Sequence, residues 1–159
     1  MNIYTIGVYG FTPDQFFEKL IENKIDLFID IRRRRAVRGS TFSFVNSKKL
    51  QQKLETLGIE YIHVLDLAPT NEIRDLQKET DRNEGIHKRE RLGLGDVFIK
   101  EYKERVLKKY DLKDLVSQLA KSHSKKPVLF CVEREPKACH RSLVANELKN
   151  QFSATIIDL

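Results

Sequence analysis

The sequence predicts a three-layer α/β fold, with a mostly parallel sheet of about five strands and helices on both faces. Strand-like runs alternate with helix-like runs along the chain, which favours parallel strands joined by crossover helices. Several strand-like runs are almost continuously apolar, as in strands that are buried on both faces. The length of 159 residues suits one domain, so we expect residues 1–159 to form a single α/β domain.

Each predicted strand is bounded by turn or helix signals. The strands are Asn2–Ile6, Ile25–Ile31, Ile59–Val64, Lys126–Val132 and Ala154–Leu159. The first helix should begin after Thr12, because Gln15 completes a capping box and a proline opens the first turn. A second helix should run from Ser47 to Leu57 and stop at Gly58. A further helix, Arg141–Lys149, should lie between the last two strands.

A polar helical excursion at about residues 68–125 separates the third and fourth predicted strands. It starts with a charged stretch, residues 68–94, that is rich in helix formers. A helical pattern follows at Val97–Tyr110, and Asp111 caps another helix. The charged stretch fits a lid, a dimer arm or a charged surface helix, and we take the surface helix as the default.

The positive charge of the chain is concentrated in one segment. Residues 31–60 hold eight Lys and Arg against two Glu, which accounts for the whole net charge of +6. Such a segment attracts phosphates, nucleic acid or other anions. No apolar run approaches the ~20 residues of a membrane helix, so we expect a cytoplasmic protein with no membrane partner. The sequence leaves the oligomeric state open.

Polar residues follow the ends of most predicted strands. Ligands of open parallel sheets bind beyond the carboxyl ends of the strands. We therefore expect an anionic small molecule or nucleotide to contact this edge of the sheet. The predicted substrate-binding residues are Gly7, Asp30, Arg32, His63, Cys131 and Arg141.

The segment from residue 129 to residue 142 passes from a strand through a short loop directly into a helix. The helix N-terminus should lower the pKa of the Cys139 thiol, and His140 can transfer a proton near neutral pH. Glu133 can hold Arg141 or His140 through a charge-assisted hydrogen bond. We expect Cys139, His140 and Glu133 to be catalytic, whereas Cys131 lies in an apolar strand and is better interpreted as a core residue.

Two other types of cysteine site are not expected. Cys131, Cys139 and His140 offer metal-ligand atoms, but the cysteines are not closely spaced and a fourth ligand is unassigned, so we predict no metal and no cofactor. A phosphatase loop needs an arginine six positions after its cysteine, where this chain has Lys137 and Ala145.

The chain resembles the domain of unknown function 488 family over nearly its whole length. The residues that carry the resemblance are Cys131-x-Glu133-x-x-Pro136-x-x-Cys139-His140-Arg141, Thr5-Ile6-Gly7, Asp30-x-Arg32, Tyr61-x-His63, Leu67-Ala68-Pro69-Thr70 and Lys88-Arg89-x-Arg91. Val8 stands where many members have histidine, so no role of that histidine is carried over. The resemblance implies an α/β fold with the cysteine, glutamate, histidine and arginine at one site, and no settled activity.

Three classes of function remain open from the sequence. The first is a Cys/His-dependent enzyme, of open reaction class, that acts on a phosphate-bearing small molecule or nucleotide. The second is a nucleic-acid-binding protein that uses the basic segment 32–38, with weak binding expected, and the third is a structural or interaction module. The nucleic-acid alternative relies on Arg33, Arg34, Arg35, Arg38, Phe42 and Phe44.

Overall fold

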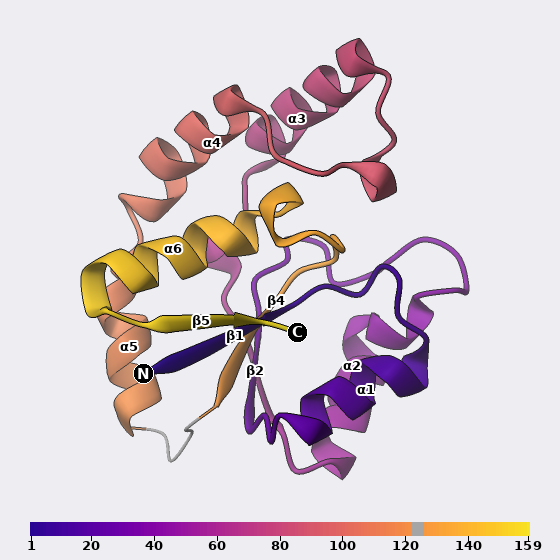
Figure 1. Cartoon of the computed structure of the whole chain (residues 1–159), viewed down its shortest axis with the longest axis vertical. Coiled ribbons are helices and arrows are strands. Elements are labelled where there is room, and N and C mark those ends of the chain that lie inside the picture. Colours follow the sequence, from indigo (N-terminus) through magenta and orange to yellow (C-terminus); the bar gives the residue numbers. More distant parts are fainter. Residues whose placement is uncertain (122–125) are drawn as a thin grey trace.

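The structure, a computed structural model, describes residues 1–121 and 126–159. Five parallel strands form one sheet in the order β3-β2-β4-β1-β5 (Figure 1). The strands are β1 (Asn2–Ile6), β2 (Leu27–Asp30), β3 (Glu60–His63), β4 (Pro127–Phe130) and β5 (Thr155–Asp158). The predicted α/β class and all the predicted strands are confirmed, although every strand after the first is shorter than predicted.

The helices begin and end close to the predicted positions. They are α1 (Pro13–Glu22), α2 (Ser47–Thr56), α3 (Asn71–Glu84), α4 (Asp96–Tyr102), α5 (Leu112–Lys121) and α6 (His140–Phe152). Thr12 and Gln15 form the predicted capping box at the start of α1. The Asp111 carboxylate accepts a hydrogen bond from the Lys113 backbone N–H at 2.8 Å, as its predicted capping role requires. A π-helical stretch, Lys103–Leu107, replaces the second half of the long helix predicted at 97–110.

Alternating side chains of the strands enter two separate cores. On one face, Phe28 and Phe130 pack with Phe16 of α1 and Leu50 of α2. The opposite face packs against α4, α5 and α6; its cluster includes Leu27, Ile29, Leu129, Leu115, Val144 and Leu148. Both faces of the sheet are therefore covered, which explains why the strand sequences are almost continuously apolar.

The connections that follow the neighbouring strands β1 and β4 run over opposite faces of the sheet. The crossover from β1 to β2 uses α1, and the crossover from β4 to β5 uses α6, which covers the other face. Such a change of direction leaves a crevice beyond the carboxyl ends of the strands. The two chains leaving β1 and β4 touch there, because a Cβ atom on Gly7 would lie 1.9 Å from the Glu133 carbonyl oxygen.

Two helices of the segment between β3 and β4, α3 and α4, lie above α6 (Figure 1). In Figure 1, α3 and α4 lie side by side at the top of the molecule, and α3 packs against α4. Ile73, Gln77 and Asp81 of α3 are buried, whereas Asp75 and Lys78 are among its exposed residues, so α3 is a charged surface helix as expected, with one face packed inward. Residues 122–125 of the predicted excursion lie outside the described residues. Within the described part of the chain, no helix has the length and apolar character to cross a membrane.

Candidate functional site

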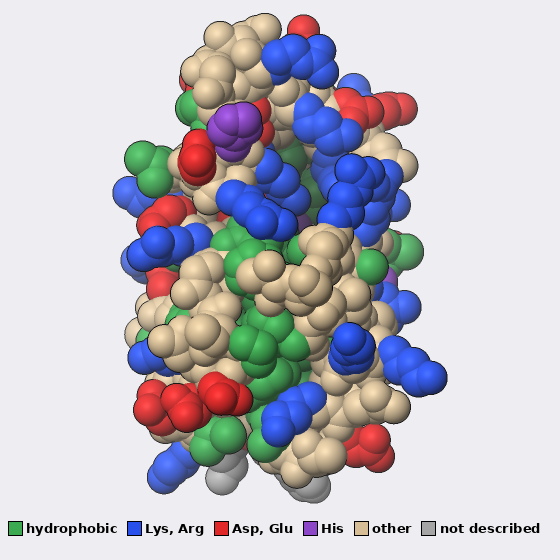
Figure 2. Space-filling view, turned by 90° about the vertical axis from the view of Figure 1, so that its right-hand side faces the viewer, with side chains coloured by type: hydrophobic (Ala, Val, Ile, Leu, Met, Phe, Trp, Pro, Cys, Tyr) green, Lys and Arg blue, Asp and Glu red, His purple; other side chains and the backbone are tan. Residues whose placement is uncertain are grey.

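The carboxyl ends of β2 and β4 border a cavity of about 590 Å³, which we call the basic pocket. Its walls come from residues 32–38, from α3 and residues 88–94, and from residues 131–133 and 138–140. Among the residues that the structure describes, nine Lys and Arg side chains line it, against two carboxylates. Figure 2 shows Lys and Arg side chains gathered around a hollow in the upper half of this face. The pocket therefore has a strongly positive potential that attracts anions.

Two thiols and an imidazole converge in the wall of the basic pocket. Cys131 directly follows β4, Cys139 is the N-cap residue of α6, and His140 is the first residue of that helix. His140 Nδ1 lies 3.7 Å from the Cys131 sulfur and 3.8 Å from the Cys139 sulfur. A short 3₁₀ turn at Pro136–Ala138 folds the loop back and brings the two cysteines together.

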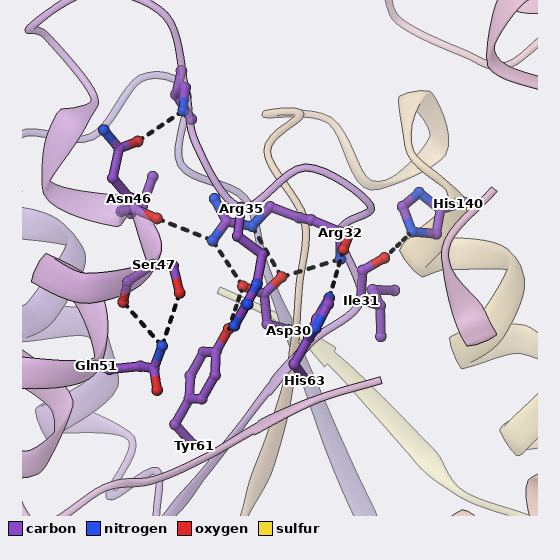
Figure 3. Close-up of polar contacts among 12 residues, drawn as sticks. Asp30, Ile31, Arg32, Arg35, Asn46, Ser47, Gln51, Tyr61, His63 and His140 are labelled. Carbon is purple, nitrogen blue, oxygen red and sulfur yellow. Dashed lines mark hydrogen bonds and ion pairs between the residues drawn. The ribbon is translucent and has the colours of Figure 1, made fainter. Parts of the chain in front are cut away.

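The other ring nitrogen of His140 fixes the orientation of the ring. His140 Nε2 lies 2.9 Å from the Ile31 carbonyl oxygen (Figure 3). A carbonyl only accepts, so Nε2 carries the hydrogen, and in the neutral ring the Nδ1 lone pair faces the sulfurs. His63 Nε2 makes the equivalent bond to the Arg32 carbonyl at 2.8 Å. Two imidazoles thus hold successive carbonyls after β2.

The two thiols differ in acidity. Burial opposes ionisation of Cys139, but the hydrogen bond with Cys131 and the nearby charges of His140 and Arg141 lower the Cys139 pKa well below its usual value. The hydrogen bond with Cys139, together with burial, raises the Cys131 pKa well above its usual value. The pKa of Cys139 is lowered, which is the direction that the sequence predicted. The sequence prediction relied on the helix N-terminus, whereas in the structure the lowering comes from Cys131, His140 and Arg141.

Glu133 is buried in the pocket wall and is held by two cations from the loop that follows α3. Arg91 Nη2 donates to the Glu133 carboxylate at 3.1 Å, and Lys88 Nζ lies 3.5 Å from the same oxygen. Burial raises the pKa of Glu133, and the charges of Lys88 and Arg91 partly offset this effect. Arg91 also bonds Asp81 of α3 at 3.0 Å. The predicted bond from the Glu133 carboxylate to Arg141 or His140 is replaced by these contacts.

Arg141 is 1% exposed and does not line the basic pocket. Its guanidinium donates to the Glu133 carbonyl at 2.6 Å, to the Arg134 carbonyl at 3.0 Å and to the Thr5 hydroxyl at 3.3 Å. Arg141 therefore joins the start of α6 to the loop after β4 and to β1. The structure gives this predicted substrate-binding residue a positioning role.

Arg32 is oriented toward the basic pocket by Asp30. The fully buried Asp30 carboxylate accepts from the Arg32 backbone N–H, Nε and Nη2 at 3.0, 2.9 and 2.7 Å, and from the Tyr61 hydroxyl at 2.9 Å (Figure 3). Among residues 1–121 and 126–159, Arg32 Nη1 is buried without a hydrogen-bond partner, and so is Nε of Arg91. Both residues line the basic pocket. Unpaired buried donors are unusual in folded proteins and indicate where a ligand can bind.

The predicted site residues thus divide into two groups. Those that line the basic pocket are Cys131, Glu133, Cys139, His140 and Arg32. Those that lie behind it are Gly7, Asp30, His63 and Arg141, which hold the lining residues or their loops in place.

The predicted nucleic-acid surface is only partly assembled. Arg33, Arg34 and Arg38 line the basic pocket, whereas Arg35 points to the Tyr61 hydroxyl at 3.5 Å. The Phe42 ring packs against Tyr9 with ring centroids 5.1 Å apart, and Phe44 packs against Phe16 and Phe17 of the core. Phe42 is thus buried and Phe44 is half-buried against the aromatic core, which leaves little of either ring free to stack on bases.

The sequence did not predict that α3 and the loop after it, residues 85–95, line the pocket. The missed lining residues are Arg74, Gln77, Lys78, Asp81, Lys88, Arg89 and Arg91. The first four are spaced at i, i+3, i+4 and i+7, and this polar stripe along one helix face is the sequence signal that could have identified the wall. Burial and the nearby charge of Arg34 lower the pKa of Arg74, which reflects the crowding of cations in the pocket.

The chain matches the protein-family model described as Domain of unknown function DUF488 over residues 12–148. That range begins just before α1 and ends within α6. No curated protein and no solved structure matched the chain.

Proposed function

Because the chain belongs to the family of Domain of unknown function DUF488, whose description names no reaction, we propose a function from its site. The protein is an enzyme that binds a phosphate-bearing small molecule or nucleotide in the basic pocket. The observation that carries this proposal is the coincidence of cationic lining, unpaired guanidinium donors and reactive side chains in one cavity.

The charge of the pocket supports a phosphate group as the part that is recognised. Arg32 and Arg91 each present a buried guanidinium nitrogen without a partner, and guanidinium groups bind phosphate oxygens with charge-assisted hydrogen bonds. The surrounding excess of seven cations over carboxylates favours a ligand that carries several negative charges. The cavity volume of about 590 Å³ is in the range of small-molecule sites.

The reactive side chains lie in the same wall as the anion-binding groups. Cys139 and His140 provide a thiol and an imidazole, and Glu133 provides a buried carboxylate whose raised pKa suits proton transfer. Arg141 positions the loop that carries Glu133, and Gly7 permits the close approach of that loop to β1. We expect the enzyme to act in the cytoplasm, where thiols stay reduced.

A nucleic-acid partner is less well supported than a small molecule. Arg33, Arg34 and Arg38 face the pocket, so they can contact the phosphates of a nucleotide there. The aromatic rings that would stack on bases pack against the core instead, with Phe42 buried and Phe44 half-buried. An oligonucleotide is therefore expected to bind weakly, mainly through its phosphates.

Thermal unfolding with a graded series of ligands tests the proposal. Pyrophosphate and ADP should raise the melting temperature by roughly 5–10 °C at ~100 times their Kd, and adenosine, which lacks phosphate, should not. Arg34 and Arg38 are exposed lining residues, so replacing both with Ala should weaken ADP binding about tenfold, or ~1.4 kcal/mol.

A matched variant controls for net charge. Lys48 and Lys49 of α2 are exposed and do not line the basic pocket. Their replacement with Ala removes the same charge and should change ADP binding less than about twofold. Equal weakening by both pairs of substitutions, or no stabilisation by either phosphate ligand, rejects the proposed function.

A further inference from the structure

Three potential metal ligands lie together in the wall of the basic pocket. The two sulfurs and Nδ1 of His140 are all within 4.8 Å of one another, and in the described part of the chain this is the group of His, Cys, Asp and Glu residues close enough to share a metal ion. A tetrahedral zinc ion with ordinary bond lengths places sulfur and nitrogen ligands roughly 3.5 Å apart. The sulfur to Nδ1 distances of 3.7 and 3.8 Å need only a small contraction to reach it.

The neutral imidazole of His140 has the form that a metal requires. The bond from Nε2 to the Ile31 carbonyl fixes the hydrogen on Nε2 and leaves the Nδ1 lone pair directed at the sulfurs. Histidine ligands of protein-bound metals commonly donate their second ring N–H to a carbonyl or carboxylate in this way. His63 has the same kind of bond but lies outside the group of three, so the bond alone does not define the site.

The sequence predicted no metal because the cysteines are far apart in the chain and a fourth ligand is unassigned. Neither feature prevents a metal from binding in the folded chain. The turn at Pro136–Ala138 brings Cys131 and Cys139 together despite their separation in sequence. The lack of a fourth protein ligand is typical of catalytic zinc sites, which keep one position for water or substrate. Cys131, Cys139 and His140 all line the basic pocket, so a metal here would have its remaining position toward the cavity.

We propose that Cys131, Cys139 and His140 bind one Zn²⁺ ion, with an open fourth position that faces the basic pocket. Thiolate and imidazole ligands favour zinc among the common divalent cations. Two thiolates neutralise the charge of the ion, so the many cations of the pocket do not oppose its binding. The ion supplies a Lewis acid beside the anion-binding guanidinium groups. This proposal goes beyond the proposed function, because Cys139 and His140 then act as metal ligands rather than as a free thiol and imidazole. Phosphate binding does not depend on it, because none of the three ligands is needed to hold a phosphate.

Metal content and cobalt spectroscopy test the proposal on the full chain without a histidine tag. The protein should purify with one zinc per chain by elemental analysis and, after removal of zinc with a chelator, should take up one Co²⁺. Cobalt in a tetrahedral thiolate site gives visible d–d bands and near-ultraviolet thiolate charge-transfer bands. The chain has two cysteines, so Cys131→Ser and Cys139→Ser should each lose about half of the charge-transfer intensity or all metal binding.

A pair of histidine variants provides the matched control. His140→Gln should weaken Co²⁺ binding at least tenfold, whereas His63→Gln removes an equivalent imidazole-to-carbonyl bond and should keep the cobalt spectrum. Circular dichroism verifies that each variant is folded. Failure of the folded, chelator-treated wild-type chain to bind either metal overturns the proposal, and so does a bound cobalt ion without thiolate bands. ADP binding is measured separately, so loss of either proposal leaves the other testable.

Discussion

Replacement of the buried Arg141 side chain tests how the loop of the candidate site is held. Arg141→Ala leaves two backbone carbonyls, those of Glu133 and Arg134, without their donor. Two hydrogen bonds from a charged donor contribute roughly 1.5–3 kcal/mol each, and removal of the buried charge returns part of that because its desolvation no longer opposes folding. We therefore expect the free energy of unfolding to fall by about 3–5 kcal/mol, and the melting temperature by about 6–20 °C.

Urea unfolding followed by far-ultraviolet circular dichroism measures this loss. Arg134→Ala is the matched control, because its side chain is 73% exposed and its carbonyl still accepts from Arg141. We expect that control to stay within about 0.5 kcal/mol of the wild type. If Arg141→Ala unfolds at the same urea concentration as Arg134→Ala, the guanidinium does not hold the loop and the reasoning is refuted.

Three further results are expected. Gly7→Ala should destabilise the fold by ~3 kcal/mol in urea unfolding, because its Cβ would lie 1.9 Å from the Glu133 carbonyl oxygen; an unchanged midpoint contradicts this contact. Tyr61→Phe should cost about 1 kcal/mol at neutral pH. Burial raises the pKa of Tyr61 in the folded chain, so its contribution is complete below the unfolded pKa of ~10 and is lost as pH rises through the higher folded value. The difference between Tyr61→Phe and the wild type should therefore shrink in alkaline solution, and a constant difference across that range argues against it. A single-stranded oligonucleotide should bind weakly in fluorescence anisotropy, indifferent to sequence and with affinity falling steeply with salt; tight binding that persists at high salt favours the nucleic-acid alternative.

The sequence was sufficient for the features that depend on local pattern. Apolar runs identified the strands because both faces of the sheet are covered, and Thr12 with Gln15 identified the start of α1 because a capping box is made within four residues. The rule that ligands bind at strand ends placed Cys131, Cys139 and His140 at one edge of the sheet. Their ligand atoms converge to within 4.8 Å because of the conformation of the loop between Cys131 and Cys139, and hydrophobic periodicity does not predict loop conformation.

The features that were missed depend on contacts between distant segments. Arg141 bonds Thr5, which lies at the opposite end of the chain, so its burial could not be inferred from its neighbours in sequence. The polar composition of α3 predicts a charged surface helix, as the structure shows, but it does not reveal that Arg91 in the loop after α3 pairs with Glu133 across the site. Phe42 resembled an exposed ring beside a basic run, and only the packing against Tyr9 shows that it belongs to the core.

A crystal structure of the protein with pyrophosphate shows whether the basic pocket binds phosphate, because it locates the anion. We predict density for the anion inside the basic pocket, with oxygens within hydrogen-bond distance of the guanidinium groups of Arg32 and Arg91, each of which has a buried donor without a partner among the described residues. Density for pyrophosphate only on exposed lysines such as Lys48 and Lys49, with none in the pocket at a saturating concentration, would contradict phosphate binding in the basic pocket.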